Sequence, residues 1–281
     1  MDVGEITRND YKARIHQFIG FTNGQLEADH NIFLNYKKYL LERNNIGVST
    51  KNKYLATARI FLKELNRIGV LPRDITQNIK SFSQGKKHKR SGLDETQVSK
   101  IIRGLSEMTL TPMNTRMMAL LSLLIFQGLR QIEIVRLDVT DINLETSNAM
   151  IQGKGRDDKE MIDLHPETVK ALRKYLTVNK LADGPLFVSN SNNGKGQRLT
   201  TKSVREIVGK LLVENGIEGK TTHGFRHFFT TTMIKQFGGN LLDVMQYTRH
   251  KSVEMLVVYN DRIRKSEDLP KYYRAFSKVE I

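Results

Sequence analysis

The stretch from Thr222 to Thr231, THGFRHFFTT, places two histidines and an arginine within five residues, among three phenylalanines. A guanidinium group presents a fork of N–H donors that matches two phosphate oxygens, and imidazoles also bond to phosphate oxygens. His223, Arg226 and His227 could therefore form one wall of a phosphate-binding site, with the phenylalanines anchoring their helix in the core. A zinc site at the two histidines is disfavoured, because no third ligand accompanies them.

Three more polar stretches, far apart in the sequence, could belong to the same site. They are GLRQIE with Arg130, GKG with Lys154, and RHKSVEMLVVY with His250 and Tyr259. Taken alone, Arg130 could form an ion pair with Glu133, and Lys154 could be a solvated turn residue. Tyr259 could be a core side chain. The order and spacing of all the stretches together favour a shared chemical role.

In this order, the stretches resemble the motifs of the tyrosine recombinases, the phage-integrase and Xer-like family. QGLRQIEIVRL resembles the Gly-Leu-Arg-x-x-Glu box of that family, and IQGKGRDDKEMIDLHPE resembles its lysine hairpin. HGFRHFFTT resembles its His-x-x-Arg-His box, and YTRHKSVEMLVVY resembles its His box with a tyrosine nine residues later. The resemblance covers roughly residues 92–265, with all motifs in order.

The sequence departs from the family pattern at three places. Phe225 stands where leucine is usual, and Tyr247–Arg249 precede His250 where a Leu-Gly pair is usual. Val257 and Val258 stand where a threonine often precedes the nucleophile. None of these changes removes a reacting group. Arg249 either adds positive charge beside the site or points to solvent.

The resemblance implies attack on a phosphodiester, and the residue types suit that reaction. Arg130 and Arg226 could hold the scissile phosphate and offset the extra charge of the transition state, each such donor contributing roughly 3 kcal/mol. Because arginine stays charged near neutral pH, we expect both to act as clamps and not as proton carriers.

Tyr259 is the expected nucleophile, which gives a phosphotyrosyl bond. Free tyrosine has a pKa near 10, so the phenol needs positive neighbours or a base. His223 and His250 are expected to bond to phosphate oxygens, and His223 also to help take the proton. Lys154, on its Gly-Lys-Gly hairpin, is the expected general acid for the leaving 5′-oxygen.

Two further residues are expected to support these groups without reacting. Glu133 is expected to orient an arginine, and His227 is expected to contact the reacting groups but not the phosphate. The phosphodiester energy is kept in the covalent intermediate, so the chemistry implies no cofactor, no ATP and no metal. In agreement, the sequence lacks a GxxxxGK[ST] loop and a convincing acidic metal cluster.

Composition points to a polyanionic partner. The 281 residues carry a net charge of +15 and contain no cysteine. An excess of positive charge favours nucleic acid or an anionic membrane surface, although a generally basic soluble protein stays open. The longest apolar run, Met117–Phe126, is too short to span a bilayer, and the polar start MDVGEITRND does not resemble a signal peptide. We expect double-stranded DNA as partner, no membrane, and a cytoplasmic, nucleoid-associated location.

Periodic apolar residues predict helices over most of the chain. Three candidates precede residue 85, the third with Ser49 as N-cap and Gly69 as C-cap. A helix capped by Asp94 opens the second part, and the apolar stretch NTRMMALLSLLIFQGLR is expected at the centre of its core. Short strands are predicted near Ile142, at Ala149–Gln152 and at Glu160–Leu164, and a short separate helix is predicted in the tail.

The predicted fold class is mainly α with a small antiparallel β-sheet, in a two-domain tyrosine recombinase architecture. A helical N-terminal core-DNA-binding domain (1–85) precedes a basic linker (86–92) and a mixed α/β catalytic domain with a C-terminal tail helix (93–281). The linker reads GKKHKRSG with its flanking glycine, so it could follow the phosphates of a duplex or simply be solvated. The expected DNA-contacting residues are Lys51, Lys53, Lys86, Lys87, Lys89 and Arg90.

The resulting functional prediction is a site-specific recombinase or integrase that cuts and rejoins DNA through a 3′-phosphotyrosyl intermediate. The family implies a homo-tetramer on two DNA sites, expected to be monomeric when free, with an accessory DNA-bending protein or a partner recombinase left open. Two alternatives are a type IB topoisomerase, which relaxes DNA with the same nucleophile, and a DNA-binding regulator that kept the fold but lost catalysis.

Overall fold

The computed structural model describes residues 5–26, 31–85, 92–153, 155, 157–190 and 194–275. The chain divides into two compact units, residues 1–86 and residues 87–281. Each unit has a hydrophobic core of its own. Among the described helices, none is long and apolar enough to cross a membrane. The fold confirms the predicted class, mainly helical with a small antiparallel sheet.

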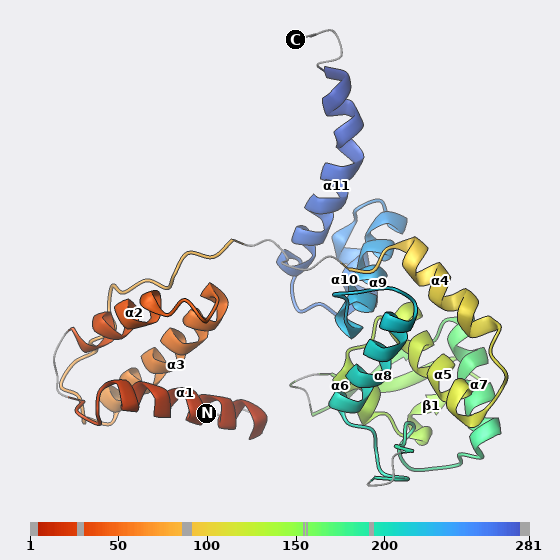
Figure 1. The fold of residues 1–281 in the computed structure, drawn as a ribbon, viewed down its shortest axis with the longest axis horizontal. Coiled ribbons are helices and arrows are strands. Elements are labelled where there is room, and N and C mark those ends of the chain that lie inside the picture. Colours follow the sequence, from red (N-terminus) through yellow and green to blue (C-terminus); the bar gives the residue numbers. More distant parts are fainter. Residues whose placement is uncertain are drawn as a thin grey trace. The chain divides into compact units, whose positions relative to one another are not determined.

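The described part of the first unit contains the helices α1 (Glu5–Phe21), α2 (Ile32–Glu42) and α3 (Val48–Arg67) (Figure 1). They meet on an aromatic and aliphatic core. Phe18 of α1 lies edge-on to Tyr36 of α2, with 4.8 Å between ring centroids. Leu55 and Leu62 of α3 are buried against them, and so is Leu71 from the irregular segment after α3. The unit therefore holds together through side chains of all its helices.

The helix ends agree with the sequence in part. The N-cap of α3 is Gly47 and not Ser49, which lies in the first turn instead. The prediction was wrong because the extended backbone of Gly47 already ends the preceding loop. Gly69 has a positive φ of 80° just beyond the C-cap, where glycine is favoured. In the second unit, Asp94 caps its helix as predicted, since its carboxylate accepts from the Gln97 N–H at 2.8 Å.

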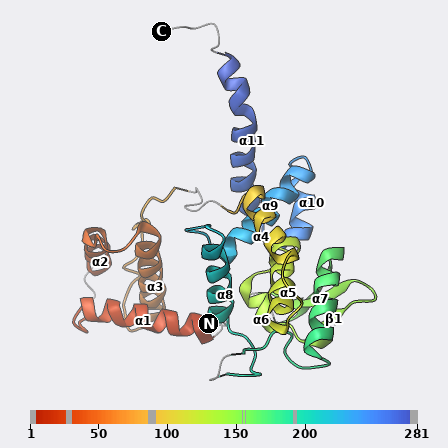
Figure 2. The ribbon, with the colours of Figure 1, turned by 45° about the vertical axis from the view of Figure 1, so that its right-hand side comes forward.

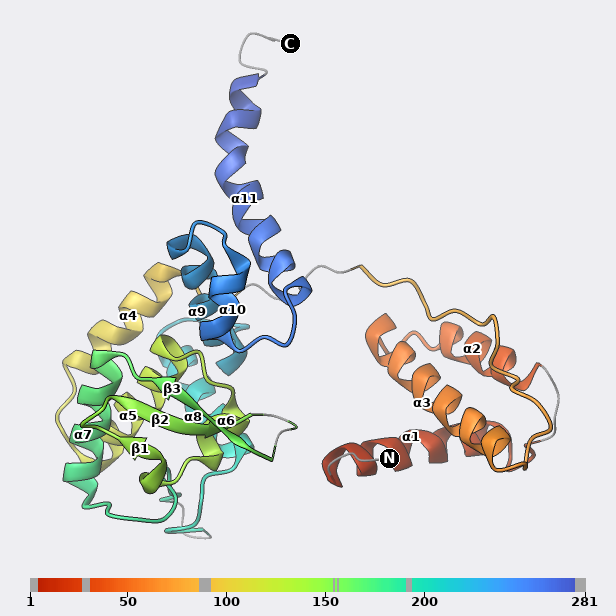
Figure 3. The ribbon, with the colours of Figure 1, turned by 180° about the vertical axis from the view of Figure 1, so that it is seen from behind.

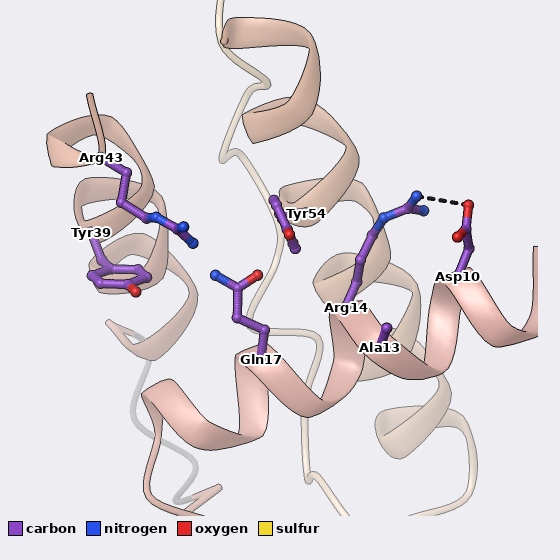
Figure 4. A pocket seen from close by; sticks show the side chains of 7 residues that line it. All are labelled: Asp10, Ala13, Arg14, Gln17, Tyr39, Arg43 and Tyr54. Carbon is purple, nitrogen blue, oxygen red and sulfur yellow. Dashed lines mark hydrogen bonds and ion pairs between the residues drawn. The ribbon is translucent and has the colours of Figure 1, made fainter. Parts of the chain in front are cut away.

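An open hollow of about 650 Å³ lies between the helices of the first unit (Figure 4). It is lined by Asp10, Ala13, Arg14, Gln17, Tyr39, Arg43 and Tyr54. Arg14 already forms an ion pair with Asp10 at 3.0 Å. None of these lining residues is predicted to react, so the hollow is not the candidate active site.

The second unit carries the remaining elements. Its helices are α4 (Glu95–Ser106), α5 (Pro112–Phe126), α6 (Gln131–Arg136), the 3₁₀ turn η1 (Val139–Asp141), α7 (Pro166–Asn179), α8 (Thr201–Glu214), α9 (Thr222–Gln236), α10 (Leu241–Thr248) and α11 (Glu254–Ala275). Every residue from Ala119 to Ile125 of α5 is buried, and α5 packs against α7 and α9. This confirms α5 as the centre of the core.

A three-stranded antiparallel sheet is packed on the helices of this unit (Figure 3). Its strands are β1 (Ile142–Asn143), β2 (Asn148–Gln152) and β3 (Lys159–Asp163), close to the predicted positions. Ile151 pairs with Glu160, and Gln152 pairs with Lys159. The β2–β3 turn therefore begins directly after Gln152, and Lys154, which lies in this turn, is outside the described residues.

The C-terminal part differs from the prediction of a separate short tail helix. A single continuous helix, α11, runs from Glu254 to Ala275. Between Asn260 and Asp268 the sequence contains neither glycine nor proline, so nothing separates the tail from the turns that carry Tyr259, and Pro270 lies inside the helix without ending it. Beyond its first turns α11 extends away from the other helices of the unit (Figure 2), and Tyr273 is exposed.

Candidate active site

Separate elements of the second unit bring most of the predicted site residues together. Arg130 is the N-cap of α6, Arg226 lies on α9, His250 follows α10 and Tyr259 lies on α11. The guanidinium of Arg226 is 3.5 Å from the His250 imidazole, whose ring centroid is 6.2 Å from that of Tyr259. Residues from four distant stretches therefore converge on one place.

Arg226 is almost completely buried, with 3% of its surface exposed. Its Nη1 donates to the Gly128 carbonyl at 2.7 Å, and its Nη2 donates to the Thr248 carbonyl at 2.6 Å. These two bonds fix the plane of the guanidinium. Burial lowers the pKa of Arg226 to about 10, and the charges of Arg130 and Arg249 act in the same direction. At neutral pH the group keeps its charge, so it is a fixed cation at the centre of the site.

Gly128 makes this arrangement sterically feasible, although sequence analysis assigned it no role. It has a positive φ of 56°, and a Cβ atom at this position would lie 2.3 Å from the ring of Phe229. A side chain there would push α9 away from the loop that leads to Arg130. The glycine in the motif GLR was the sequence signal, but its contact with Phe229 depends on tertiary packing.

Arg130 is held by Glu133, one turn further along α6. The Glu133 carboxylate accepts from the backbone N–H of Arg130 at 2.8 Å and from its Nη1 at 2.7 Å. Glu133 is 1% exposed, whereas the Arg130 side chain is 30% exposed. This geometry fits the supporting role expected of Glu133, because a buried carboxylate fixes an arginine whose remaining surface faces solvent.

Tyr259 is covered, with 4% of its surface exposed. It packs with Ile234, Val244 and Leu256 in a small apolar cluster. Burial raises the pKa of the phenol above its ordinary value of 10.0, although the charges of Arg226 and Arg130 act against this shift. The phenol is therefore neutral at pH 7 in this state, and a proton must leave it during any nucleophilic attack.

His227 packs against Tyr259, and Gly92 packs against His227. The His227 ring is tilted against that of Tyr259 at 4.7 Å between centroids. A Cβ atom on Gly92 would lie 2.2 Å from His227 Nδ1, so only glycine fits there. His223, on the first turn of α9, is exposed and lines a small pocket with Gly92 and His227. Of the two histidines, His223 is thus the one open to a ligand.

His250 is buried, and its Nδ1 lies 2.7 Å from the Thr248 hydroxyl. Burial, together with the positive charges of Arg226 and Arg130, lowers the pKa of His250 to about 3. The imidazole is therefore neutral at physiological pH, so it can bond to a phosphate oxygen but adds no charge. Thr248, which sequence analysis treated only as a departure from the family pattern, fixes the ring through this contact.

We expect this neutral histidine to make the fold sensitive to acid. Between pH 6.5 and 3 the unfolded chain protonates this histidine and the folded chain does not, so folding stability must fall as pH falls through this window. The slope contributed by one such group is at most about 1.4 kcal/mol per pH unit. Thermal unfolding followed between pH 7.5 and 4.5 should show a shallower decline for His250→Gln than for the wild type. Equal slopes in the two proteins would contradict the assignment.

The residues expected to contact DNA differ in their exposure to solvent. Lys51 is 8% exposed and its ammonium donates to the Leu41 carbonyl at 2.7 Å. Its selection as a phosphate contact was wrong, because its charge is used inside the first unit. Lys53, two residues on, is exposed and stays a candidate. The linker residues Lys86, Lys87, Lys89 and Arg90 lie outside the described residues.

Residues 91–265 match the phage integrase family. Tyrosine recombinase XerC of Roseiflexus castenholzii is 28% identical over 285 residues, which cover 96% of this chain and 88% of the relative. XerC of Pelotomaculum thermopropionicum is 27% identical over 259 residues, which cover 88% of this chain and 81% of the relative.

Solved structures show the same fold. The XerH site-specific recombinase bound to palindromic difH substrate has a TM-score of 0.74 and 19% identity, covering 95% of this chain and 81% of that chain. The Tn1549 transposon integrase in complex with circular intermediate DNA has a TM-score of 0.70 and 15% identity, covering 92% and 90%. Because the family match covers more than half of the chain, this protein belongs to the phage integrase family, the tyrosine recombinases. The predicted resemblance is confirmed.

Proposed function

We propose that this recombinase cuts and rejoins DNA strands at specific sites, with Tyr259 as the nucleophile. The observation that carries the proposal is the convergence of Arg226, His250 and Tyr259 beside the Arg130–Glu133 pair. Two fixed guanidinium groups next to a phenol suit a phosphodiester, whose two non-bridging oxygens they can bind. The family membership gives the same class of reaction independently.

In the cleavage step, the Tyr259 oxygen attacks the scissile phosphorus and loses its proton, and the bond to the 5′-oxygen breaks. The product is a 3′-phosphotyrosyl bond and a free 5′-hydroxyl. Arg130 and Arg226 stabilise the charge that develops on the non-bridging oxygens. The 5′-hydroxyl of a second strand then attacks the same phosphorus and displaces Tyr259, so the number of phosphodiester bonds is conserved.

Proton transfers accompany both steps. We assign the proton for the leaving 5′-oxygen to Lys154. We assign His223 to help remove the proton of the phenol, because it is exposed and shares a small pocket with His227, whose ring packs on Tyr259. His250 contributes a hydrogen bond without charge, in keeping with its lowered pKa.

Double-stranded DNA is the proposed partner. The net charge of +15 supports this, and so do structural neighbours that were solved with DNA. Strand exchange between two duplexes requires several nucleophiles, and we propose a tetramer on two sites. The outer part of α11, with Leu269 and Tyr273 exposed, is the proposed contact between protomers.

The decisive test uses a suicide substrate that carries the DNA flanking the gene of this protein, nicked so that the cleaved end is lost. We expect a covalent protein–DNA adduct on a denaturing gel, at one position only. Cleavage at many unrelated positions would favour a topoisomerase. Tight DNA binding with no adduct on any such substrate would favour a catalytically silent regulator.

The same adduct assay tests the need for a metal. Because arginines and a lysine supply the positive charge in this mechanism, we expect full cleavage in excess EDTA. The control is a titration of NaCl, which should weaken DNA binding steeply between about 50 and 200 mM. Loss of cleavage in EDTA that added divalent ions restore would contradict the proposed chemistry.

A further inference from the structure

Arg249 has an unusual backbone conformation for an arginine. It follows the last residue of α10 with φ 54° and ψ 40°, in the left-handed region. Glycine adopts this conformation without steric cost, whereas a residue with a Cβ atom is strained in it. The position therefore favours glycine on backbone grounds, and the arginine side chain must contribute something that compensates.

The side chain is turned inward, with 9% of its surface exposed. The expectation that Arg249 could point to solvent was wrong, because two carboxylates and a carbonyl attract its guanidinium. Its Nη2 lies 3.4 Å from Glu133 Oε2, and its Nε lies 3.6 Å from Glu160 Oε1. Nη1 and Nη2 also lie within 3.5 Å of the Gln127 carbonyl. The cation is thus shared between α6 and β3.

Both carboxylates lead back to predicted reacting groups. Glu133 accepts from the Arg130 guanidinium through its other oxygen, Oε1. Glu160 lies on β3 opposite Ile151, one residue pair from the β2–β3 turn whose sequence contains Lys154. The Arg249 guanidinium is already engaged by both carboxylates and by the Gln127 carbonyl. Arg249 instead joins the support of one clamp arginine to the strand that follows the lysine turn.

Charge balance explains what this contact does for Arg130. Glu133 is a buried carboxylate, and burial alone raises its pKa. The charge of Arg249 is the largest effect that opposes burial, and with the bonds from Arg130 it leaves the pKa of Glu133 below its ordinary value. With Arg249 present, Glu133 is neutralised by two cations. Without it, Arg130 alone would neutralise Glu133 and would have less positive charge for a phosphate.

We propose that Arg249 is a positioning residue for strand cleavage, which balances Glu133 so that Arg130 stays available to the phosphate and anchors the β2–β3 hairpin through Glu160. The inference rests on the proposed function, because it assumes that Arg130 and Lys154 act on the scissile phosphodiester. It assigns a role to the one cation of the site that departs from the pattern of the family.

Arg249→Gly is the principal variant, because glycine fits the left-handed backbone and removes only the side chain. We expect the DNA dissociation constant to stay within about threefold, since Arg249 is covered. The single-turnover cleavage rate at saturating enzyme should fall by about 10- to 100-fold, as expected when a reacting group is misplaced. Arg249→Lys should recover part of this rate, because it keeps the charge and loses the fork.

A matched control separates positioning from general stability. Arg116 also donates to a backbone carbonyl, that of Val188 at 2.8 Å, and it is partly buried in the same unit. Arg116→Ala should lower the melting temperature and leave the cleavage rate of the folded protein unchanged. If Arg249→Gly cleaves at the wild-type rate, or slows no more than Arg116→Ala, the proposal is overturned. A lysine variant no faster than the glycine variant would overturn it as well.

Arg249 has two contacts, one with Glu133, which supports Arg130 (the Arg130 arm), and one with Glu160, which supports the β2–β3 hairpin (the hairpin arm). A bridging 5′-phosphorothiolate, whose thiolate leaves without a proton, tests them separately. Glu160→Gln weakens only the hairpin arm and should recover its rate on this substrate. Arg249→Gly should recover only in part, because Arg130 is disturbed as well. Full recovery of Arg249→Gly would overturn the Arg130 arm, and no recovery of Glu160→Gln would overturn the hairpin arm.

Lys154→Ala, assayed in parallel, tells failure of this inference from failure of the proposed function. Its recovery on the phosphorothiolate supports Lys154 as the general acid and makes the comparison of the two arms valid. If Lys154→Ala stays slow on this substrate, the proposed acid is wrong and the hairpin arm is overturned with it. The Arg130 arm is then judged by the rate of Arg249→Gly on ordinary DNA.

Discussion

Tyr259→Phe should bind DNA as tightly as the wild type and form no covalent adduct. The substitution keeps the ring in its apolar cluster with Ile234, Val244 and Leu256 and removes only the oxygen that attacks. Removing a nucleophile leaves no alternative route to the intermediate, so the cleavage rate should fall by at least about 10⁴-fold. Adduct formation on a suicide substrate, measured by denaturing gel, gives the result directly.

Tyr273→Phe is the matched control. It lies on the same helix as Tyr259 and is 63% exposed, so it is accessible to DNA where Tyr259 is covered. We expect this variant to form the adduct at the normal rate. An adduct that persists in Tyr259→Phe and disappears in Tyr273→Phe would show that the tail tyrosine attacks, and the proposed site would be wrong.

Replacing Arg226 should give the second largest effect. Arg226→Ala removes a cation from the centre of the site, and the loss of one preorganised donor costs about 10²- to 10³-fold in rate. Arg226→Lys keeps a charge, but a single ammonium cannot reproduce a fork held by the Gly128 and Thr248 carbonyls. We therefore expect the lysine variant to be slow as well, and only modestly faster than the alanine variant.

Arg226 also stabilises the fold. Its bonds to two carbonyls join the loop before α6 to the end of α10, so both variants will also lose stability. The rate must be compared at a temperature where unfolding curves show each variant fully folded. Rescue on the 5′-phosphorothiolate would contradict the assignment, because charge stabilisation at the non-bridging oxygens is needed with either leaving group.

The covered Tyr259 and the exposed C-terminal end lie on the same helix, α11. Tyr259 lies on its first turns, which pack on α9 and α10, and the later turns extend away from them. A contact that moves the outer part of α11 would therefore be transmitted to Tyr259 through a continuous helix. The sequence prediction of a separate tail helix gave no reason to expect this link.

Local sequence determined the chemistry and most of the elements. The residue types and spacing of Arg130, Arg226, His250 and Tyr259 predicted the site, and apolar periodicity predicted α5 and the small sheet. These features depend on residues near one another in the chain, or on the kinds of atoms that a phosphodiester requires. Asp94 could be placed at a helix start for the same reason, since a cap acts within one turn.

Only the tertiary structure decided where individual cations are used. Lys51 was expected to contact DNA, but it is buried on the Leu41 carbonyl. Arg249 was left open between charge beside the site and exposure to solvent, but it lies between Glu133 and Glu160. Their partners lie 10, 116 and 89 residues away in the sequence, and no local pattern connects them. The cost of burying a charge is offset only where distant carboxylates or carbonyls meet it, and that meeting is a property of the packed chain.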